Sequence, residues 1–133
     1  MFKILIVEDN PANLTLATFL LQSAGYTVVS ATNAEAGVAL TKTEQPDLVL
    51  MDIQLPGMDG LEATALLKSD ESTRAIPVIA LTALAMKGDE ERIMAAGCDG
   101  YIAKPLDYKE FLAKVARRLK GQSLTPAEPK AAV

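Results

Sequence analysis

Short runs of apolar residues alternate along the chain with longer segments in which apolar residues recur every three or four positions. The first run, Ile4–Val7, is rich in β-branched residues, as is typical of a strand buried on both faces of a parallel sheet. Asn10-Pro11 then supplies a helix-capping residue and a proline at the first helical position. A helix that ends at Gly25 is predicted by apolar residues at helical spacing, namely Leu14, Ala17, Leu21 and Ala24.

The same alternation repeats through the rest of the chain. The pattern predicts strands at Thr27–Ala31, Leu48–Met51, Val78–Leu81 and Gly100–Ile102. It predicts helices at Ala34–Thr43, Leu61–Lys68, Lys87–Ala96 and Tyr108–Leu119. Five βα units in series indicate an α/β protein with a doubly wound parallel sheet and right-handed crossovers.

Two of these helices differ in the strength of their pattern. The last helix carries one apolar stripe, made by Tyr108, Phe111, Leu112, Val115 and Leu119. The helix from Lys87 opens with Gly88-Asp89-Glu90-Glu91-Arg92, which offers little apolar surface. We therefore expect tertiary packing to hold it loosely, and it is a candidate moving part.

The length of 133 residues suits one core, since single domains cluster at roughly 100–150 residues. We expect this domain to occupy residues 1–120. Residues 121–133 contain two prolines and no periodicity, which favours a disordered tail or the stub of a linker.

Composition excludes several kinds of chemistry. The chain has no histidine, which removes Ser-His and Cys-His nucleophile pairs and histidine metal ligands, and its single cysteine, Cys98, reads as a small buried apolar residue. The net charge of −4, without a broad basic stretch, argues against direct nucleic-acid binding. No apolar run reaches the roughly 18 residues of a membrane span, and the first residues lack a signal-peptide pattern, so we expect a cytoplasmic location and no membrane contact.

The residues that can carry chemistry stand at the ends of the predicted strands. In open α/β sheets, ligands bind beyond the carboxyl ends of the strands. The residues at these ends are Glu8-Asp9, Asp52, Thr82-Ala83 and Lys104-Pro105. Crowded carboxylates repel one another and need a cation, and an all-oxygen cluster selects a hard ion such as Mg²⁺. Such a site suits phosphoryl transfer with a carboxylate as nucleophile.

With these motifs in order, the chain resembles the receiver domain of two-component signalling, of the chemotaxis-regulator type. The resemblance covers nearly everything from Phe2 to about Lys120. It rests on Glu8-Asp9, on the segment Leu50-Met51-Asp52-Ile53-Gln54-Leu55-Pro56-Gly57-Met58-Asp59-Gly60, on Thr82-Ala83 and on Lys104-Pro105. It implies a flavodoxin-like (βα)5 fold with strand order 2-1-3-4-5 and a cis bond before Pro105.

The resemblance also implies a role for each residue of the site. Asp52 would be the phosphoacceptor. Mg²⁺ would be held by Asp9, Asp52 and the backbone carbonyl of Gln54, with Glu8 acting through a bound water. Thr82 would hydrogen-bond the phosphoryl oxygens, Lys104 would pair with them, and Tyr101 would turn inward when Thr82 moves.

The resemblance implies protein partners as well. A sensor histidine kinase or a histidine phosphotransfer protein would supply the phosphoryl group, and a downstream protein would read the surface formed by the fourth helix, the fifth strand and the fifth helix. With only a short tail after the last helix, the chain reads as a stand-alone regulator that signals by contact. The two prolines of that tail leave open that it is one domain of a longer protein.

Some of these residues have simpler interpretations. Asp59-Gly60-Leu61-Glu62 is a capping box, so Asp59 is assigned to helix initiation rather than to the site. Tyr101 can be a switch residue or an ordinary packing residue. Lys114, Arg117, Arg118 and Lys120 complement the dipole at the end of the last helix more simply than they indicate an acidic partner.

Two other functions remain open at this point. A Mg²⁺-dependent phosphohydrolase also forms an aspartyl phosphate, but it usually carries a second carboxylate two residues after the nucleophile, where this chain has Gln54. A flavodoxin-like FMN-binding module needs a phosphate cradle after the first strand, where Glu8-Asp9 would repel the anion.

Overall fold

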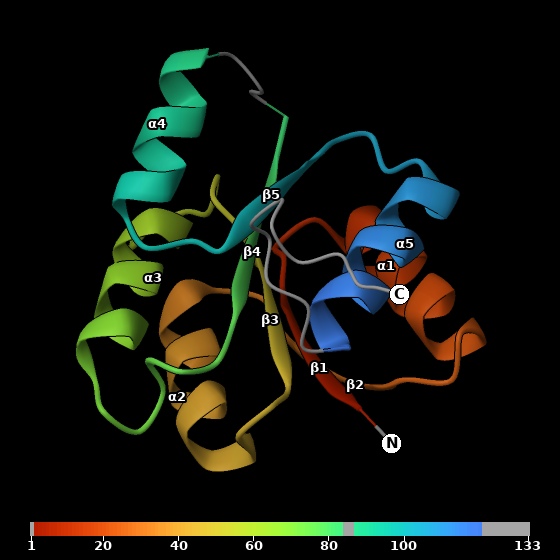
Figure 1. Cartoon of the computed structure of the whole chain (residues 1–133), viewed down its shortest axis with the longest axis horizontal. Helices are drawn as coiled ribbons and strands as arrows, with labels where there is room; N and C mark the ends of the chain where they lie inside the picture. The colour runs from red at the N-terminus through yellow and green to blue at the C-terminus, as the bar shows by residue number, and fades with distance from the viewer. Residues whose placement is uncertain (1, 84–86, 121–133) are drawn as a thin grey trace.

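Five parallel strands form the centre of the computed structural model, which describes residues 2–83 and 87–120 (Figure 1). The strands are β1 (Lys3–Val7), β2 (Thr27–Ala31), β3 (Leu48–Asp52), β4 (Val78–Thr82) and β5 (Gly100–Ala103). Each strand pairs in parallel with its neighbours, in the order β2-β1-β3-β4-β5. The predicted flavodoxin-like doubly wound fold and its strand order are confirmed.

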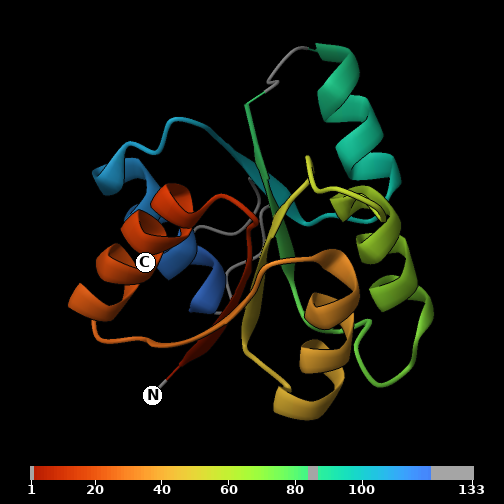
Figure 2. The same cartoon turned by 180° about the vertical axis from the view of Figure 1, so that it is seen from behind.

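Five helices cover the two faces of this sheet. They are α1 (Pro11–Ser23), α2 (Ala34–Glu44), α3 (Gly60–Ser69), α4 (Lys87–Ala95) and α5 (Tyr108–Leu119). Helices α1 and α5 lie on one face, and α2, α3 and α4 lie on the other, as both views show (Figures 1 and 2). This arrangement buries the sheet on both sides, as the continuous apolar runs of its central strands predict.

Alternate residues of each central strand enter two separate cores. Leu5, Val7, Val49 and Met51 pack on the side of α2, α3 and α4, together with residues such as Ala63, Leu67 and Ile93. Ile4, Ile6, Leu48 and Leu50 pack on the side of α1 and α5, together with residues such as Leu21, Phe111 and Val115. Because both faces are filled, β1, β3 and β4 are held rigidly at their carboxyl ends, where the polar residues follow.

The predicted helix starts are present as local hydrogen bonds. The Asn10 side chain accepts the Asn13 amide at 3.0 Å, and Pro11 is the first residue of α1. The Asp59 carboxylate accepts the Glu62 amide at 2.8 Å, while the Glu62 carboxylate accepts the Asp59 amide at 3.0 Å. The capping box is therefore confirmed, and so is the cis bond between Lys104 and Pro105.

Two residues assigned to apolar stripes are not in the core. Ala24 is exposed and caps the C-terminal end of α1, and Tyr108 is 55% exposed at the start of α5. Each stands at an end of its helix: Ala24 follows Ser23, the last residue of α1, and Tyr108 is the first residue of α5. Helix α4 does bury Ile93. The interpretation of α4 as a moving part stays a prediction. The predicted disordered tail or linker stub, residues 121–133, lies outside the described residues.

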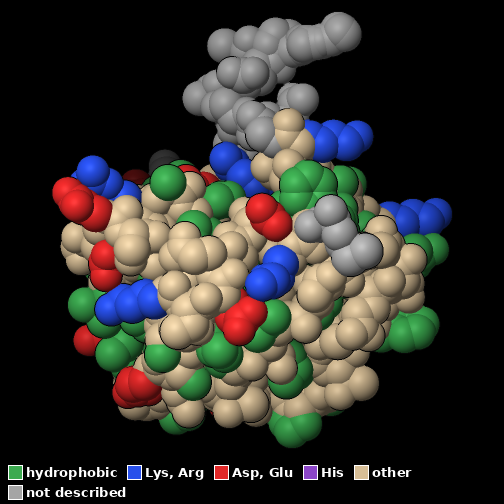
Figure 3. Space-filling view, turned by 90° about the horizontal axis from the view of Figure 1, so that it is seen from below, with side chains coloured by type: hydrophobic (Ala, Val, Ile, Leu, Met, Phe, Trp, Pro, Cys, Tyr) green, Lys and Arg blue, Asp and Glu red, His purple; other side chains and the backbone are tan. Residues whose placement is uncertain are grey.

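The amino ends of the strands form the underside of the molecule, where the chain begins in Figure 1. There the described acidic and basic side chains are interspersed rather than segregated (Figure 3). One pair at this end is Lys68 and Asp99, whose charged atoms lie 2.9 Å apart. Within residues 2–83 and 87–120, no helix is both long enough and apolar enough to cross a membrane.

Candidate active site

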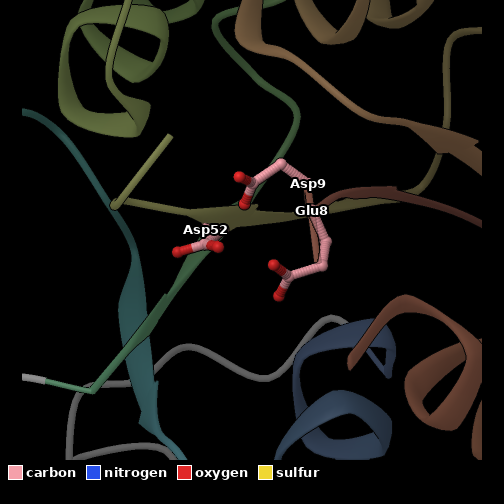
Figure 4. A group of neighbouring side chains, drawn as sticks. All are labelled: Glu8, Asp9 and Asp52. Carbon is pink, nitrogen blue, oxygen red and sulfur yellow. The ribbon is translucent and has the colours of Figure 1, made fainter. Parts of the chain in front are cut away.

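Three acidic side chains meet where β1 and β3 end. Glu8 and Asp9 follow β1 directly, and Asp52 is the last residue of β3. Each offers a carboxylate oxygen, and these oxygens lie within 4.8 Å of one another. Figure 4 shows the three side chains pointing into a shared space. The sequence placed these acids at one edge of the sheet, and the structure brings them together there.

Lys104 lies between two of these acids. Its Nζ is 2.8 Å from Glu8 Oε1 and 3.1 Å from Asp52 Oδ2. The Lys104 amide donates to the carbonyl of Thr82 at 2.7 Å, which ties the residue to the end of β4. Residues that are far apart in the sequence therefore share one charge network, because the four neighbouring strands β1, β3, β4 and β5 end at the same edge of the sheet.

Backbone groups orient the two buried carboxylates. Glu8 and Asp52 are each 2% exposed, whereas Asp9 is exposed. Asp52 Oδ1 accepts the Gln54 amide at 2.9 Å, and Glu8 Oε2 accepts the Asn10 amide at 3.2 Å. Each buried acid thus has one oxygen on a backbone amide and the other on Lys104, so its orientation is fixed from two directions.

The electrostatics of the pair Glu8 and Lys104 reflect this crowding. Burial, reinforced by the contact with Asp52, raises the pKa of the Glu8 carboxyl, although Lys104 and the Asn10 amide act in the opposite direction. Burial by itself would lower the pKa of the Lys104 ammonium, but the bond to Glu8 and the attraction of Asp52 outweigh it and raise the pKa. Lys104 is therefore a firmly charged ammonium at neutral pH.

The charges of the site favour a further cation. Three carboxylates face one ammonium, and two like charges 4 Å apart repel by about 4 kcal/mol at an effective dielectric constant of 20. All three acidic ligands offer oxygen, and no described cysteine is near them. Such a donor set suits a hard divalent ion such as Mg²⁺ and disfavours soft metals.

Thr82 lies on β4, the strand next to that of Asp52, and Tyr101 lies on β5, one strand further along the sheet. Thr82 is the buried last residue of β4, one residue beyond Leu81, which pairs with Asp52 across the sheet. Tyr101 is half-buried on β5, and its hydroxyl donates to Glu90 Oε2 on α4 at 2.6 Å. Glu90 could not be singled out from the sequence, because nothing in its position along the chain indicates which strand residue it meets.

Gly60 is a second residue that the sequence analysis did not connect to the site. It is the first residue of α3, and a Cβ at this position would overlap the backbone carbonyl oxygen of Asp52 and lie 2.7 Å from the Cα of Ile53. The absence of a side chain lets α3 start directly against the backbone that carries Asp52. The feature of the sequence that could have indicated this close approach is the glycine directly after the capping aspartate.

A family model described as the response regulator receiver domain matches residues 4–116. This chain belongs to the response-regulator receiver family. The match includes both acids after β1, Asp52, Thr82 and Lys104, so it spans the whole of the site described above. The protein is therefore a receiver domain of two-component signalling, which is a signalling domain rather than a classical enzyme.

Known proteins of this family resemble the receiver domain along most of its length. This chain is 47% identical over 113 residues to the polar-differentiation response regulator DivK of Brucella anthropi, and the match covers 85% of this chain and 92% of DivK. The DivK protein of Brucella ovis gives the same identity and coverage. The receiver fold thus accounts for nearly all of both relatives.

Solved structures give the same result. The receiver domain of a sensor histidine kinase from Pseudomonas aeruginosa, which has a magnesium ion coordinated in its active-site cleft, superposes with a TM-score of 0.83 at 39% identity. That comparison covers 91% of this chain and 98% of the other. The Vibrio cholerae chemotaxis protein CheY4 superposes with a TM-score of 0.84 at 25% identity, covering 88% and 98%.

Proposed function

We propose that this receiver domain accepts a phosphoryl group on Asp52 from a phosphohistidine of a sensor histidine kinase or a histidine phosphotransfer protein. The observation that carries the proposal is the arrangement of Asp52, a buried carboxylate with one oxygen on the Gln54 amide and the other on Lys104. A carboxylate held in this way has its rotamer fixed and its charge partly balanced before a donor arrives, which lowers the entropy cost of attack.

In the transfer, a carboxylate oxygen of Asp52 forms a bond to phosphorus while the bond from phosphorus to the histidine nitrogen breaks. The electron pair of the broken bond stays on that nitrogen. Lys104 neutralises charge on the phosphoryl oxygens, and the Thr82 hydroxyl hydrogen-bonds one of them. Because these 133 residues include no histidine, the donor histidine lies outside the sequence described.

Asp9, Asp52 and the backbone carbonyl of Gln54 would hold Mg²⁺, and Glu8 would act on it through water. The three acidic side chains fit this group because their oxygens lie within 4.8 Å of one another and outnumber the ammonium of Lys104. When bound, Mg²⁺ supplies positive charge that offsets the repulsion between the acids and the incoming phosphoryl group.

The test is phosphorylation by a small donor. Incubation with Mg²⁺ and acetyl phosphate should add the mass of one phosphoryl group, and Asp52→Asn should abolish the addition. Asp59→Asn is the matched control, because it changes a nearby acid while asparagine keeps the helix cap. Labelling that persists in Asp52→Asn would refute the assignment, and steady turnover of a phosphomonoester would favour a phosphohydrolase.

We further propose that phosphorylation changes the surface formed by α4, β5 and α5, and that a downstream protein reads this change in the cytoplasm. The new dianion would draw in the Thr82 hydroxyl, and Tyr101 would turn into the space beside it. Tyr101 stands on β5 between the two helices, with the Lys114 ammonium of α5 5.9 Å from its ring and Glu90 of α4 on its hydroxyl.

Amide chemical shifts measure this change directly. Addition of beryllofluoride and Mg²⁺ should shift residues 87–108 in the wild type and leave them unchanged in Asp52→Asn. Shifts confined to the residues around Asp52 would show that the phosphoryl site is correct but that the surface does not respond.

A further inference from the structure

The hydroxyl of Tyr101 is already engaged in a strong hydrogen bond on the outer side of β5. It donates to Glu90 Oε2 at 2.6 Å, within the short range expected when the acceptor is charged. The bond to Glu90, ahead of partial burial, raises the pKa of the Tyr101 hydroxyl, in agreement with this geometry. Glu90 and Tyr101 are both half-buried, so solvent competes only partly for the two groups.

This bond links helix α4 to strand β5. Glu90 lies on α4, whose sequence offers little apolar surface, and Tyr101 lies on β5, where its ring also borders a groove with Ile79, Met94 and Ile102. The bond therefore fixes the position of the Tyr101 ring and the distance between α4 and β5 at the same time. The Lys114 ammonium, which lies near the ring, has its Nζ 3.9 Å from Glu110 Oε2.

A turn of Tyr101 toward Thr82 breaks this bond. The hydroxyl is at the far end of the ring, so a change of staggered rotamer carries it much farther than a hydrogen bond can stretch. The cost of losing the bond then falls on the switched state only. An interaction that exists in only one of two states changes the ratio of their populations. The size of this change is the factor that corresponds to the free energy of the interaction.

We infer that Glu90 is a positioning residue that holds Tyr101 away from Thr82 and thereby sets how strongly this receiver domain resists switching before it is phosphorylated. The inference rests on the proposed function, since it concerns the Tyr101 movement described there. By linkage, an interaction that opposes the switched state must weaken every ligand that selects this state, including a phosphoryl mimic bound at Asp52.

The experiment compares beryllofluoride binding, in the presence of Mg²⁺, between the wild type and Glu90→Ala. Because a charge-assisted, half-buried hydrogen bond is lost, we expect the variant to bind about three- to tenfold more tightly. Glu91→Ala is the matched control: it removes the same charge from the same turn of α4, but Glu91 is exposed. Glu90→Gln, which keeps a neutral acceptor, should give an intermediate affinity.

A double-mutant comparison separates the bond from other effects of the substitution. In a Tyr101→Phe background, which lacks the hydroxyl, Glu90→Ala should have no further effect on binding. The ring carbon that bears the Tyr101 hydroxyl should titrate at lower pH in Glu90→Ala than in the wild type, which verifies that the bond existed in solution. Both readouts depend on the hydroxyl and not on the general stability of α4.

The outcomes distinguish the two proposals. If the wild type fails to bind beryllofluoride, or binds it as well after Asp52→Asn, the proposed phosphoacceptor site is wrong. If the wild type binds but Glu90→Ala matches Glu91→Ala, or Glu90→Ala has the same effect with and without the Tyr101 hydroxyl, the inference about Glu90 is overturned. Glu90→Gln keeps the test valid should Glu90→Ala fold poorly.

Discussion

Lys104 is the residue on which the charge balance of the site depends. Its ammonium contacts Glu8 and Asp52, both almost fully buried, and its own side chain is only 15% exposed. Removing the ammonium leaves two buried carboxylates without their shared partner, and such groups then carry an uncompensated cost of desolvation.

We therefore expect Lys104→Met to lower the free energy of unfolding by about 1–3 kcal/mol in the absence of Mg²⁺. Urea unfolding measures the change. Lys109→Met is the control, because Lys109 is exposed on α5, and it should change stability by less than about 0.5 kcal/mol. Equal effects of the two substitutions would show that the contacts of Lys104 contribute nothing to the fold.

Asp70 gives a pH dependence outside the site. The Ser72 amide and then the Ser72 hydroxyl donate to its carboxylate, and they lower the pKa of Asp70. An acid with a lowered pKa stabilises the fold above its unfolded pKa of about 3.9, and this contribution is lost as the pH falls through the folded value.

The stability difference between the wild type and Asp70→Ala should therefore be largest at neutral pH and shrink as the pH falls below about 4. Urea unfolding at several pH values measures it, and titration of the Asp70 carboxyl carbon gives the pKa itself. Glu71→Ala, which removes the charge of an exposed neighbouring acid, is the control. A difference that grows toward low pH would contradict the assignment.

At the scale of elements, α3 begins with two features that serve different purposes. The capping box of Asp59 and Glu62 satisfies amides at the start of the helix, whereas Gly60 allows the helix to start against the backbone of Asp52. The first feature concerns helix stability, and the second concerns where the helix stands relative to the site.

Asp59→Ala should therefore destabilise the protein by about 1 kcal/mol, as loss of a helix cap does, while leaving the affinity for Mg²⁺ within about twofold. Thermal unfolding and calorimetric titration with Mg²⁺ measure the two quantities. Asp59→Asn should restore the stability because asparagine also caps helices. A large loss of Mg²⁺ affinity in Asp59→Ala would assign Asp59 to the site, against the interpretation as a cap.

At the scale of the molecule, Cys98 lies in the core on the side of α2, α3 and α4, and it is 4% exposed. Burial, ahead of other effects, raises the pKa of its thiol. Reagents attack the thiolate of an accessible cysteine, so both burial and the raised pKa protect this residue in the folded state.

We expect a disulfide reagent to react with Cys98 at least about a thousandfold more slowly in the folded protein than in urea, since reaction requires the core to open. The rate of colour release at several urea concentrations gives the free energy of this opening. Lys104→Met should speed the reaction by the factor that corresponds to its loss of stability. A fast reaction in the native protein would show that this side of the sheet opens locally.

The sequence by itself determined the fold and the composition of the site. Buried parallel strands need continuous apolar runs, so Ile4–Val7 and its counterparts were visible, and so were the polar residues that end them. Glu8, Asp9, Asp52 and Lys104 could be predicted as one cluster because parallel strands end at one edge. Periodicity did not show that Ala24 and Tyr108, which stand at the ends of their helices, would be exposed.

Only the tertiary structure decided which side chains meet across elements that no local pattern relates. The contact of Glu90 with Tyr101 depends on how α4 is set against β5, and the close approach of Gly60 to Asp52 depends on the path of the chain between β3 and α3. Local propensity and periodicity fix the elements and their faces. Their relative rotation and translation follow from packing of the whole core, and a hydrogen bond is sensitive to displacements of less than 1 Å or so.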